Sequence, residues 1–206
     1  MTMMKKISAM AMAMALAATM AVGTAMSASA AEVTNANVYY AESVAASTVT
    51  TTGKTIAWSY GYVTKNLKMC VMKTDLSEVS MADAGIVKDS VTLKKTGSTF
   101  VMTIPVTSIK RSFLGKEYTA DITKITAYAE GGTVLCTADV INGVATLTFP
   151  TSSKLPFVGD TTVDGVEYTN SIKLKFNTTM EDSAIAGILP SAMKTPETYA
   201  LFNVVR

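Results

Sequence analysis

The 206 residues of this chain include no histidine, which limits the catalytic and metal-binding chemistry open to it. Without histidine, the Ser-His-Asp and Cys-His arrangements of nucleophilic catalysis are excluded, and so are the usual general base and histidine metal sites. The sequence also lacks a Gly-rich phosphate loop and a nucleophile elbow. We therefore expect a protein that is not an enzyme.

Tyr168 is the tyrosine placed best to hold a ligand, in the segment DGVEYTNSIKLKF at 164–176. The segment alternates as a strand does, so its apolar residues share a face with Tyr168 if it is extended throughout. Two interpretations are open. Tyr168 is either an aromatic residue of a core-facing strand or a phenolate that binds a metal. The second interpretation requires the pKa of the Tyr168 hydroxyl to fall from about 10. The apolar residues of this face are Val166, Ile172, Leu174 and Phe176.

Cys70 and Cys136 are the two cysteines of the chain. In an exported protein they can form one disulfide, whose loop of about 65 residues would add roughly 4 kcal/mol in the chain-entropy model. The alternative is a pair of buried thiols in neighbouring strands, and both interpretations stay open. Two cysteines without histidine do not make a zinc site.

The N-terminal residues 1–30 have the pattern of a secretory signal peptide. Lys5 and Lys6 precede an Ala/Met-rich apolar run that ends in Ser-Ala-Ser-Ala at 27–30. No second apolar run is long enough to span a membrane. We therefore expect a secreted or cell-wall-associated protein. The 16 basic and 16 acidic residues that follow the signal give no reason to expect nucleic acid or an anionic membrane as a partner.

The mature chain divides into an Ala/Ser/Thr-rich spacer at 31–55, a domain of short strands at 56–178 and a C-terminal tail at 179–206 with a short helix from about 181. Turn signals between the strands, such as Asn142-Gly143, indicate an antiparallel sandwich or barrel. Residues 74–86 predict one short helical turn. Trp58 precedes both cysteines, which excludes the antibody-type order of Cys, Trp and Cys.

From about 66 to 177 the order of elements resembles the NEAT domain, the near-iron-transporter module of Gram-positive surface and secreted proteins. The strand LKMCVMK is followed by a short helical segment around Ser80, Met81 and Ala82. The pair of strands in SVTLKKTGSTFVMTIPV comes next, and a hairpin and a closing V-x-Y-x-x-x-x-x-L-x-F strand end the match.

The resemblance implies an all-β, immunoglobulin-like antiparallel β-sandwich with a short helical lip, and haem (heme b) in a groove between that lip and the last hairpin. Tyr168 matches the first position of the family's Y-x-x-x-Y signature, whose tyrosine ligates the haem iron, and Ile172 occupies the second position. Ser80 would bond a haem propionate and Met81 would cover the distal face. The hairpin residues lining the other wall would be Val158, Val163 and Val166.

The implied function is that of a secreted haem-binding protein for haem and iron acquisition. Its partners would be haem or a haem protein, and other haem-relay surface proteins. The alternative is a non-catalytic protein- or glycan-binding module on the same sandwich that binds no haem, which Ile172 favours because it cannot donate a hydrogen bond. On the alternative interpretations of the lip, Ser80 is a helix cap and Met81 a core residue.

Overall fold

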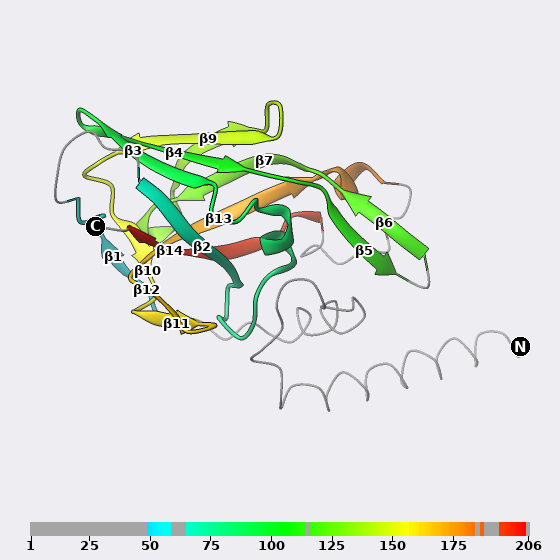
Figure 1. Cartoon of the computed structure of the whole chain (residues 1–206), viewed down its shortest axis with the longest axis horizontal. Helices are drawn as coiled ribbons and strands as arrows, with labels where there is room; N and C mark the ends of the chain where they lie inside the picture. Colours follow the sequence, from blue (N-terminus) through cyan, green and yellow to red (C-terminus); the bar gives the residue numbers. More distant parts are fainter. Residues whose placement is uncertain (1–48, 59–64, 114–115, 184–185, 188–193, 205–206) are drawn as a thin grey trace, which may run out of the picture.

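The computed structural model describes residues 49–58, 65–113, 116–183, 186–187 and 194–204, which form antiparallel strands and short 3-10 helices. In chain order these are β1 Thr52–Lys54, β2 Lys65–Lys73, η2 Met81–Gly85, β3 Val91–Thr96, β4 Thr99–Pro105, β5 Ile109–Phe113, β6 Lys116–Ala120, β7 Ile122–Tyr128, η3 Glu130–Gly132, β8 Val134–Asp139, β9 Val144–Pro150, β10 Leu155–Phe157, β11 Thr161–Val163, β12 Val166–Tyr168, β13 Asn170–Thr178, η4 Thr179–Asp182 and β14 Glu197–Val204 (Figure 1).

Eight of the strands form one antiparallel sheet in the order β8-β7-β13-β14-β2-β3-β4-β9. Its two edge strands, β8 and β9, are joined by the Asn142-Gly143 turn, where φ is 51° and 74°, as the predicted I′ turn requires. A hydrogen bond from the Thr148 backbone to the Cys136 sulfur also links these strands. The sheet therefore curls into a nearly closed barrel, which confirms the all-β antiparallel fold class.

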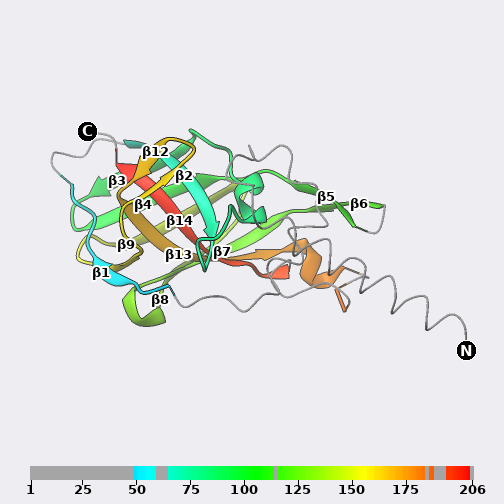
Figure 2. The ribbon, with the colours of Figure 1, turned by 90° about the horizontal axis from the view of Figure 1, so that it is seen from below.

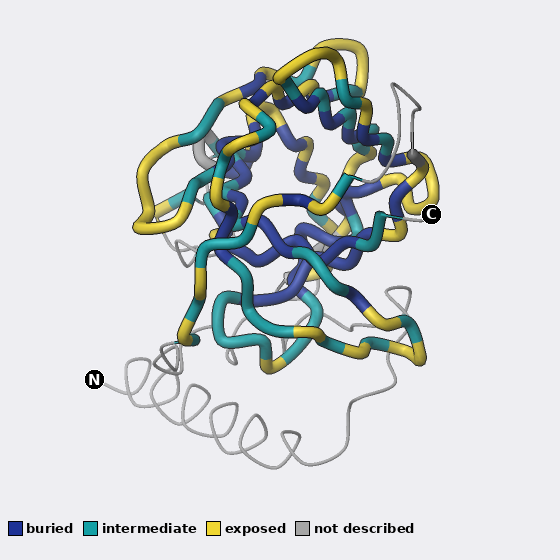
Figure 3. The backbone as a smooth tube through the Cα atoms, turned by 90° about the vertical axis from the view of Figure 1, so that its left-hand side faces the viewer, coloured by how far each residue is buried: buried dark blue, intermediate teal, exposed yellow. Residues whose placement is uncertain are grey.

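The alternation of the strands puts every second side chain into the barrel. In β4, Phe100, Met102 and Ile104 are buried as predicted, and Phe149 of the paired β9 lies with its ring centroid 5.9 Å from that of Phe100. Trp58 adds an edge-on contact to Phe100 at 5.5 Å. Buried stretches follow the sheet and exposed ones the turns (Figure 3). We call this set of side chains the main core.

β14 lies in the middle of the sheet, between β13 and β2. The boundary expected at 178 is therefore wrong, because the segment expected as a tail supplies a central strand. Its residues from Thr198 to Phe202 are buried in succession, as in a strand covered on both faces. The expected helix from about 181 is a single 3-10 turn, η4, as far as the structure describes it; residues 184–185 and 188–193 lie outside the described part.

The expected spacer at 31–55 also reaches into the fold. β1, at its end, pairs with β10 in a small separate ladder. Gly53 N donates to the Glu130 carboxylate at 2.9 Å, which ties this strand to η3. The rest of the expected spacer up to residue 48 lies outside the described residues. Where the structure describes the chain, it contains no helix long and apolar enough to cross a bilayer.

Two hairpins stand apart from the main sheet. β5 and β6 form a two-stranded ribbon that projects from one end of the barrel (Figure 1). β11 and β12 form a short ladder at the opposite end, close to β2 and β14 in both ribbon views (Figure 2). The second hairpin covers part of the outer face of the sheet, and the candidate site lies beneath it.

Candidate functional site

A second group of buried side chains, here called the outer cluster, lies on the face of the sheet opposite the main core. It is smaller than the main core and, unlike it, carries groups with ligand chemistry: two phenols, a thiol and a thioether. Its buried members are Cys70, Met72, Tyr168, Tyr199 and Leu201. Partly buried side chains surround them: Val49, Leu76, Val79, Val158, Val163 and Val166.

The floor of the outer cluster comes from the pairing of β2 with β14. The register places Cys70 opposite Leu201 and Met72 opposite Tyr199, and directly paired residues project from the same face of a sheet. The residues between them, Val71 among others, point the other way into the main core. From Met69 to Lys73 β2 is buried on both faces, which its apolar run reflects, whereas Asn66 and Lys68 are exposed.

The cover of the outer cluster is the β11–β12 hairpin. Its ladder has three residue pairs, from Thr161 with Tyr168 to Val163 with Val166. Asp164 and Gly165 form the turn with φ of 50° and 76°, the conformation of a two-residue hairpin. Val163 and Val166, both predicted as wall residues, therefore lie side by side with Tyr168 above the floor.

Tyr168 does not share a face with Ile172, and that prediction is wrong. Thr169 interrupts the strand, so β12 ends at Tyr168 and β13 begins at Asn170. Lys54 Nζ donates to the Thr169 carbonyl at 2.7 Å, and Thr169 Oγ1 donates to Asn203 Oδ1 at 3.0 Å. After this break Ile172 points into the main core, while Tyr168 points into the outer cluster.

The Tyr168 phenol lies in apolar surroundings. Its side chain is 6% exposed, and no described residue hydrogen-bonds its hydroxyl. Burial raises the pKa of Tyr168 to about 12, and the nearby Cys70 and Asp83 add to the effect. The phenol is therefore protonated at neutral pH, and a metal ion would have to displace that proton to bind the oxygen.

The lip residues match their alternative interpretations. Ser80 is the N-cap of η2, and its side-chain oxygen accepts from Ala82 N at 3.3 Å. Met81 packs in the main core and not in the outer cluster. The structure thus brings Tyr168 together with Val158, Val163 and Val166, but Met81 and Ile172 lie among the side chains of the main core.

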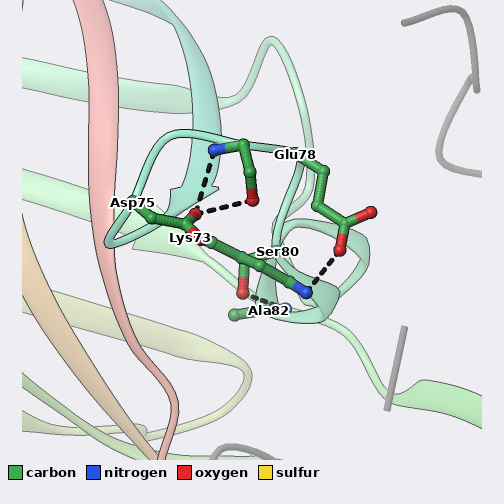
Figure 4. A network of polar contacts seen from close by, with 6 residues as sticks. Lys73, Asp75, Glu78, Ser80 and Ala82 are labelled. Atoms are coloured by element: carbon green, nitrogen blue, oxygen red, sulfur yellow. Dashed lines mark hydrogen bonds and ion pairs between the residues drawn. The ribbon is translucent and has the colours of Figure 1, made fainter. Parts of the chain in front are cut away.

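The loop between β2 and η2 is stabilised by a polar network that forms one wall of the outer cluster (Figure 4). Lys73 Nζ pairs with the Glu78 carboxylate, and Lys73 N donates to Glu78 O at 3.0 Å. Ser77 N and Oγ both donate to Asp75 Oδ1. These contacts hold Leu76 and Val79 against the cluster, and Leu76 takes a positive φ of 58° in the turn.

Asp83 is a buried carboxylate that fastens η2 to β2, and sequence reasoning missed it. Its Oδ1 accepts from Val71 N at 2.8 Å, and its Oδ2 forms an ion pair with Lys88 Nζ at 2.8 Å. Partial burial alone would lower the pKa of Lys88, but the hydrogen bond and charge of Asp83 outweigh it and raise that pKa. A lone Asp in a Ser-Met-Ala-Asp turn gives no sequence signal of this role.

Cys70 and Cys136 are both free thiols. Cys70 belongs to the outer cluster, while Cys136 packs against the main core. The strands β7, β13 and β14 separate β8 from β2, so the disulfide is absent and the thiols are not in neighbouring strands either. Within the described ranges no group of three His, Cys, Asp or Glu residues is arranged to hold a metal.

Comparisons with known proteins give structural matches only. No protein-family model and no curated protein sequence matches the chain. The NEAT5 domain of IsdX2, a B. anthracis hemophore, in complex with heme, is 12% identical, with a TM-score of 0.38 and coverage of 71% of this chain and 99% of that domain. A point mutant of that domain, also with heme, is 13% identical, with a TM-score of 0.39 and the same coverage. At these identities the matches concern the fold alone.

Proposed function

We propose that the chain is a secreted haem-binding protein for haem and iron acquisition, which holds haem in the outer cluster with Tyr168 as the iron ligand. The observation that supports this most is the Tyr168 phenol. It is nearly fully buried among apolar side chains, and no described residue hydrogen-bonds it. A phenol oxygen that no neighbouring side chain occupies is available to a ligand.

The residues of the outer cluster fit a haem. Valines of the hairpin and the Leu201 floor are apolar, as the macrocycle requires. Tyrosine is an established axial ligand of haem iron. Haem supplies a ferric ion, a Lewis acid that favours the ionised phenol. Ser80 would donate its O–H to a propionate once the lip opens, because the residue is buried in the closed structure. Met81 and Ile172 have no place in this proposal, because both pack in the main core.

Binding requires the hairpin to move. Tyr168, Cys70 and Met72 are each at most 6% exposed, so the outer cluster is closed over its own side chains. The β11–β12 ladder has only three residue pairs, and an isolated two-stranded hairpin is marginally stable in water. We therefore infer that the hairpin swings away from β2 and β14 to admit the ligand, and that the displaced valines then line the bound macrocycle.

The biological role proposed is capture and relay without catalysis. The signal-like residues 1–30 support export. Haem would come from free haem or a haem protein and pass to other haem-relay surface proteins through transient complexes. A single phenolate ligand suits such a role. A partner protein that offers its own ligands to the iron can then take over the haem.

The test is a titration of the mature protein with ferric haem, followed by the visible spectrum. We expect saturable binding at one haem per chain with a tyrosinate charge-transfer band. Tyr168→Phe should abolish that band and weaken binding. The matched control is Tyr199→Phe, since Tyr199 lies in the same cluster and is about as buried. Loss of the band in the control alone would contradict the assignment of Tyr168.

A second function, a protein- or glycan-binding module that binds no haem, is favoured by one observation. The outer cluster is already filled, and the second tyrosine position of the haem signature holds Ile172, which is fully buried in the main core. Exposed Val134 and Ile141 at the two ends of the β8 edge would then be contact residues. Absence of saturable haem binding in the titration supports this alternative.

A further inference from the structure

Two sulfur atoms meet on the floor of the outer cluster. Cys70 Sγ donates a hydrogen bond to Met72 Sδ at 3.7 Å. The two residues are neighbours on one face of β2, with Val71 between them pointing into the main core. Both are buried, at 4% and 6% exposure. A thiol and a thioether this close form a pair of soft ligands, and nothing in the haem proposal uses them.

Tyr168 belongs to the same cluster as the two sulfur atoms. The residue is more than nine-tenths buried, and no described residue hydrogen-bonds its hydroxyl. The phenol is therefore an oxygen donor of the cluster that is open to serve the sulfur pair, and the three groups come from two elements, β2 and β12.

The geometry and the chemistry select the ion. An ion about 2.3 Å from each sulfur, the usual metal–thiolate distance, would make an S–metal–S angle of roughly 110°. Thiolate and thioether ligands prefer soft ions such as Cu(I), whereas calcium and magnesium require oxygen ligands. A structural zinc site needs four ligands, and the described residues supply no cluster of that kind.

We propose that Cys70 and Met72 form a Cu(I) site in the outer cluster, with the Tyr168 hydroxyl as a weak third donor. Binding replaces the thiol proton: Cys70–SH and Cu(I) give Cys70–S–Cu(I) and one released proton, with no change of oxidation state. Uptake should strengthen as the pH rises, since each ion displaces one proton.

This site is independent of the haem proposal, although the two ligands share the outer cluster and the same covering hairpin. Haem would rest on the Tyr168 oxygen, while Cu(I) would rest on the two sulfur atoms of β2. Each ligand can therefore be removed by a different substitution, and the failure of one proposal leaves the other testable. If both hold, the two ligands should compete for the cluster.

The experiment is an anaerobic titration of the haem-free mature protein with Cu(I), in competition with a chromogenic Cu(I) chelator. We expect one ion per chain. Cys70→Ser should lower the affinity for Cu(I) by more than about 100-fold. This is more than the usual effect of changing a residue that contacts a metal ligand and not the metal itself. Met72→Leu should lower it about 10- to 100-fold. Tyr168→Phe should lower it less than about tenfold while weakening haem binding and abolishing its charge-transfer band.

Two matched controls belong to this series. Cys136→Ser removes the other thiol, and Met69→Leu changes a thioether of β2 that faces the main core. Both should bind Cu(I) as the unchanged protein does. Absence of stoichiometric Cu(I) uptake by the unchanged protein, or full affinity in Cys70→Ser, overturns the proposal.

A second measurement avoids variants whose folding is impaired. X-ray absorption of the unchanged protein loaded with one Cu(I) reports the neighbours of the metal. Two sulfur neighbours at about 2.3 Å support the proposal. A shell of oxygen or nitrogen alone contradicts it, whatever the variants show.

Discussion

The main core and the outer cluster share the strands β2 and β14 but differ in composition, and the difference separates stability from function. On the inner face, β14 contributes Ala200 and Phe202 to a core of aliphatic and phenylalanine side chains. On the outer face the same strand contributes Tyr199 and Leu201, beside a thiol and a thioether. The inner face of β2 carries one thioether, Met69, while the outer face of the two strands gathers a phenol, a thiol and a thioether beneath a short hairpin.

The two faces of one strand can serve different purposes, one for folding stability and the other for ligand binding. Side chains at consecutive positions point to opposite sides of a sheet. Changes on the inner face should therefore act on folding, and changes on the outer face should act on ligands with a smaller loss of stability.

Removal of residues 197–206 should have the largest effect, because it deletes β14 from the centre of the sheet. β13 and β2 would lose their shared neighbour and expose unpaired backbone groups. We expect no cooperative unfolding transition in circular dichroism. The control removes only residues 205–206, which lie beyond β14, and should unfold normally. A folded protein without 197–206 would show that the sheet closes without its central strand.

Adjacent residues of β14 compare the two faces directly. Phe202→Ala opens a cavity in the main core and should cost about 3–5 kcal/mol of the free energy of unfolding. Leu201→Ala should cost about 2–3 kcal/mol, because the hairpin above the outer cluster can settle into the space. Urea denaturation measures both. Equal losses would mean that the outer cluster is packed as rigidly as the main core.

Substitution of Asp83 tests whether this residue anchors η2 to β2. Asp83→Ala removes the acceptor of Val71 N and the partner of Lys88, and should cost about 1–3 kcal/mol in urea denaturation. The control is Asp75→Ala, which removes a carboxylate that binds only the exposed Ser77 of the same loop and should change the free energy of unfolding by less than about 0.5 kcal/mol. Similar values for the two variants would contradict the anchoring role of Asp83.

Stability should depend little on pH near neutrality, because the buried groups of the outer cluster titrate only above about pH 9. Burial, with added charge repulsion, raises the pKa of Tyr168 from 10.0 and that of Cys70 from 9.0, each to about 12. Both groups stay protonated longer in the folded state, so the unfolded state binds fewer protons once the pH passes the lower values. Stability should therefore fall as pH rises from about 9 toward 12. Thermal melts measure this fall.

The matched variant for the thermal melts is Tyr168→Phe. It removes one of the two titrating groups, so its stability should fall less steeply as the pH rises. Tyr199 has a raised pKa for the same first reason, burial, so Tyr199→Phe should also reduce the slope. A slope unchanged in both variants would place the titrating groups outside the outer cluster.

Much of the barrel was predictable from the sequence because its signals are local. The β4 alternation of Phe100, Met102 and Ile104 and the Asn142-Gly143 turn need no knowledge of distant residues. The apolar run of β2 is also a local signal, and this strand is buried on both faces from Met69 onward. The place of β14 was not predictable, because strand order depends on pairing over long separations, and Pro190 and Pro196 made the segment resemble a tail.

The candidate site was predictable only in part. Tyr168 and the hairpin valines were expected together, and the structure places them in one cluster. The break at Thr169 reversed the expected face of Ile172, because its stabilising contacts come from Lys54 and Asn203, which are far away in sequence. Cys70 and Met72 were not expected as site residues, since i, i+2 spacing in an apolar strand is also the pattern of plain core packing.

The central claim is that Tyr168 is the group through which the outer cluster binds ferric haem. The most direct measurement is the resonance Raman spectrum of the protein loaded with one ferric haem, excited in the charge-transfer band. The account predicts vibrations of an iron-bound tyrosinate, present in Tyr199→Phe and absent from Tyr168→Phe. A spectrum of a thiolate-bound haem, or tyrosinate vibrations that survive in Tyr168→Phe, would contradict it.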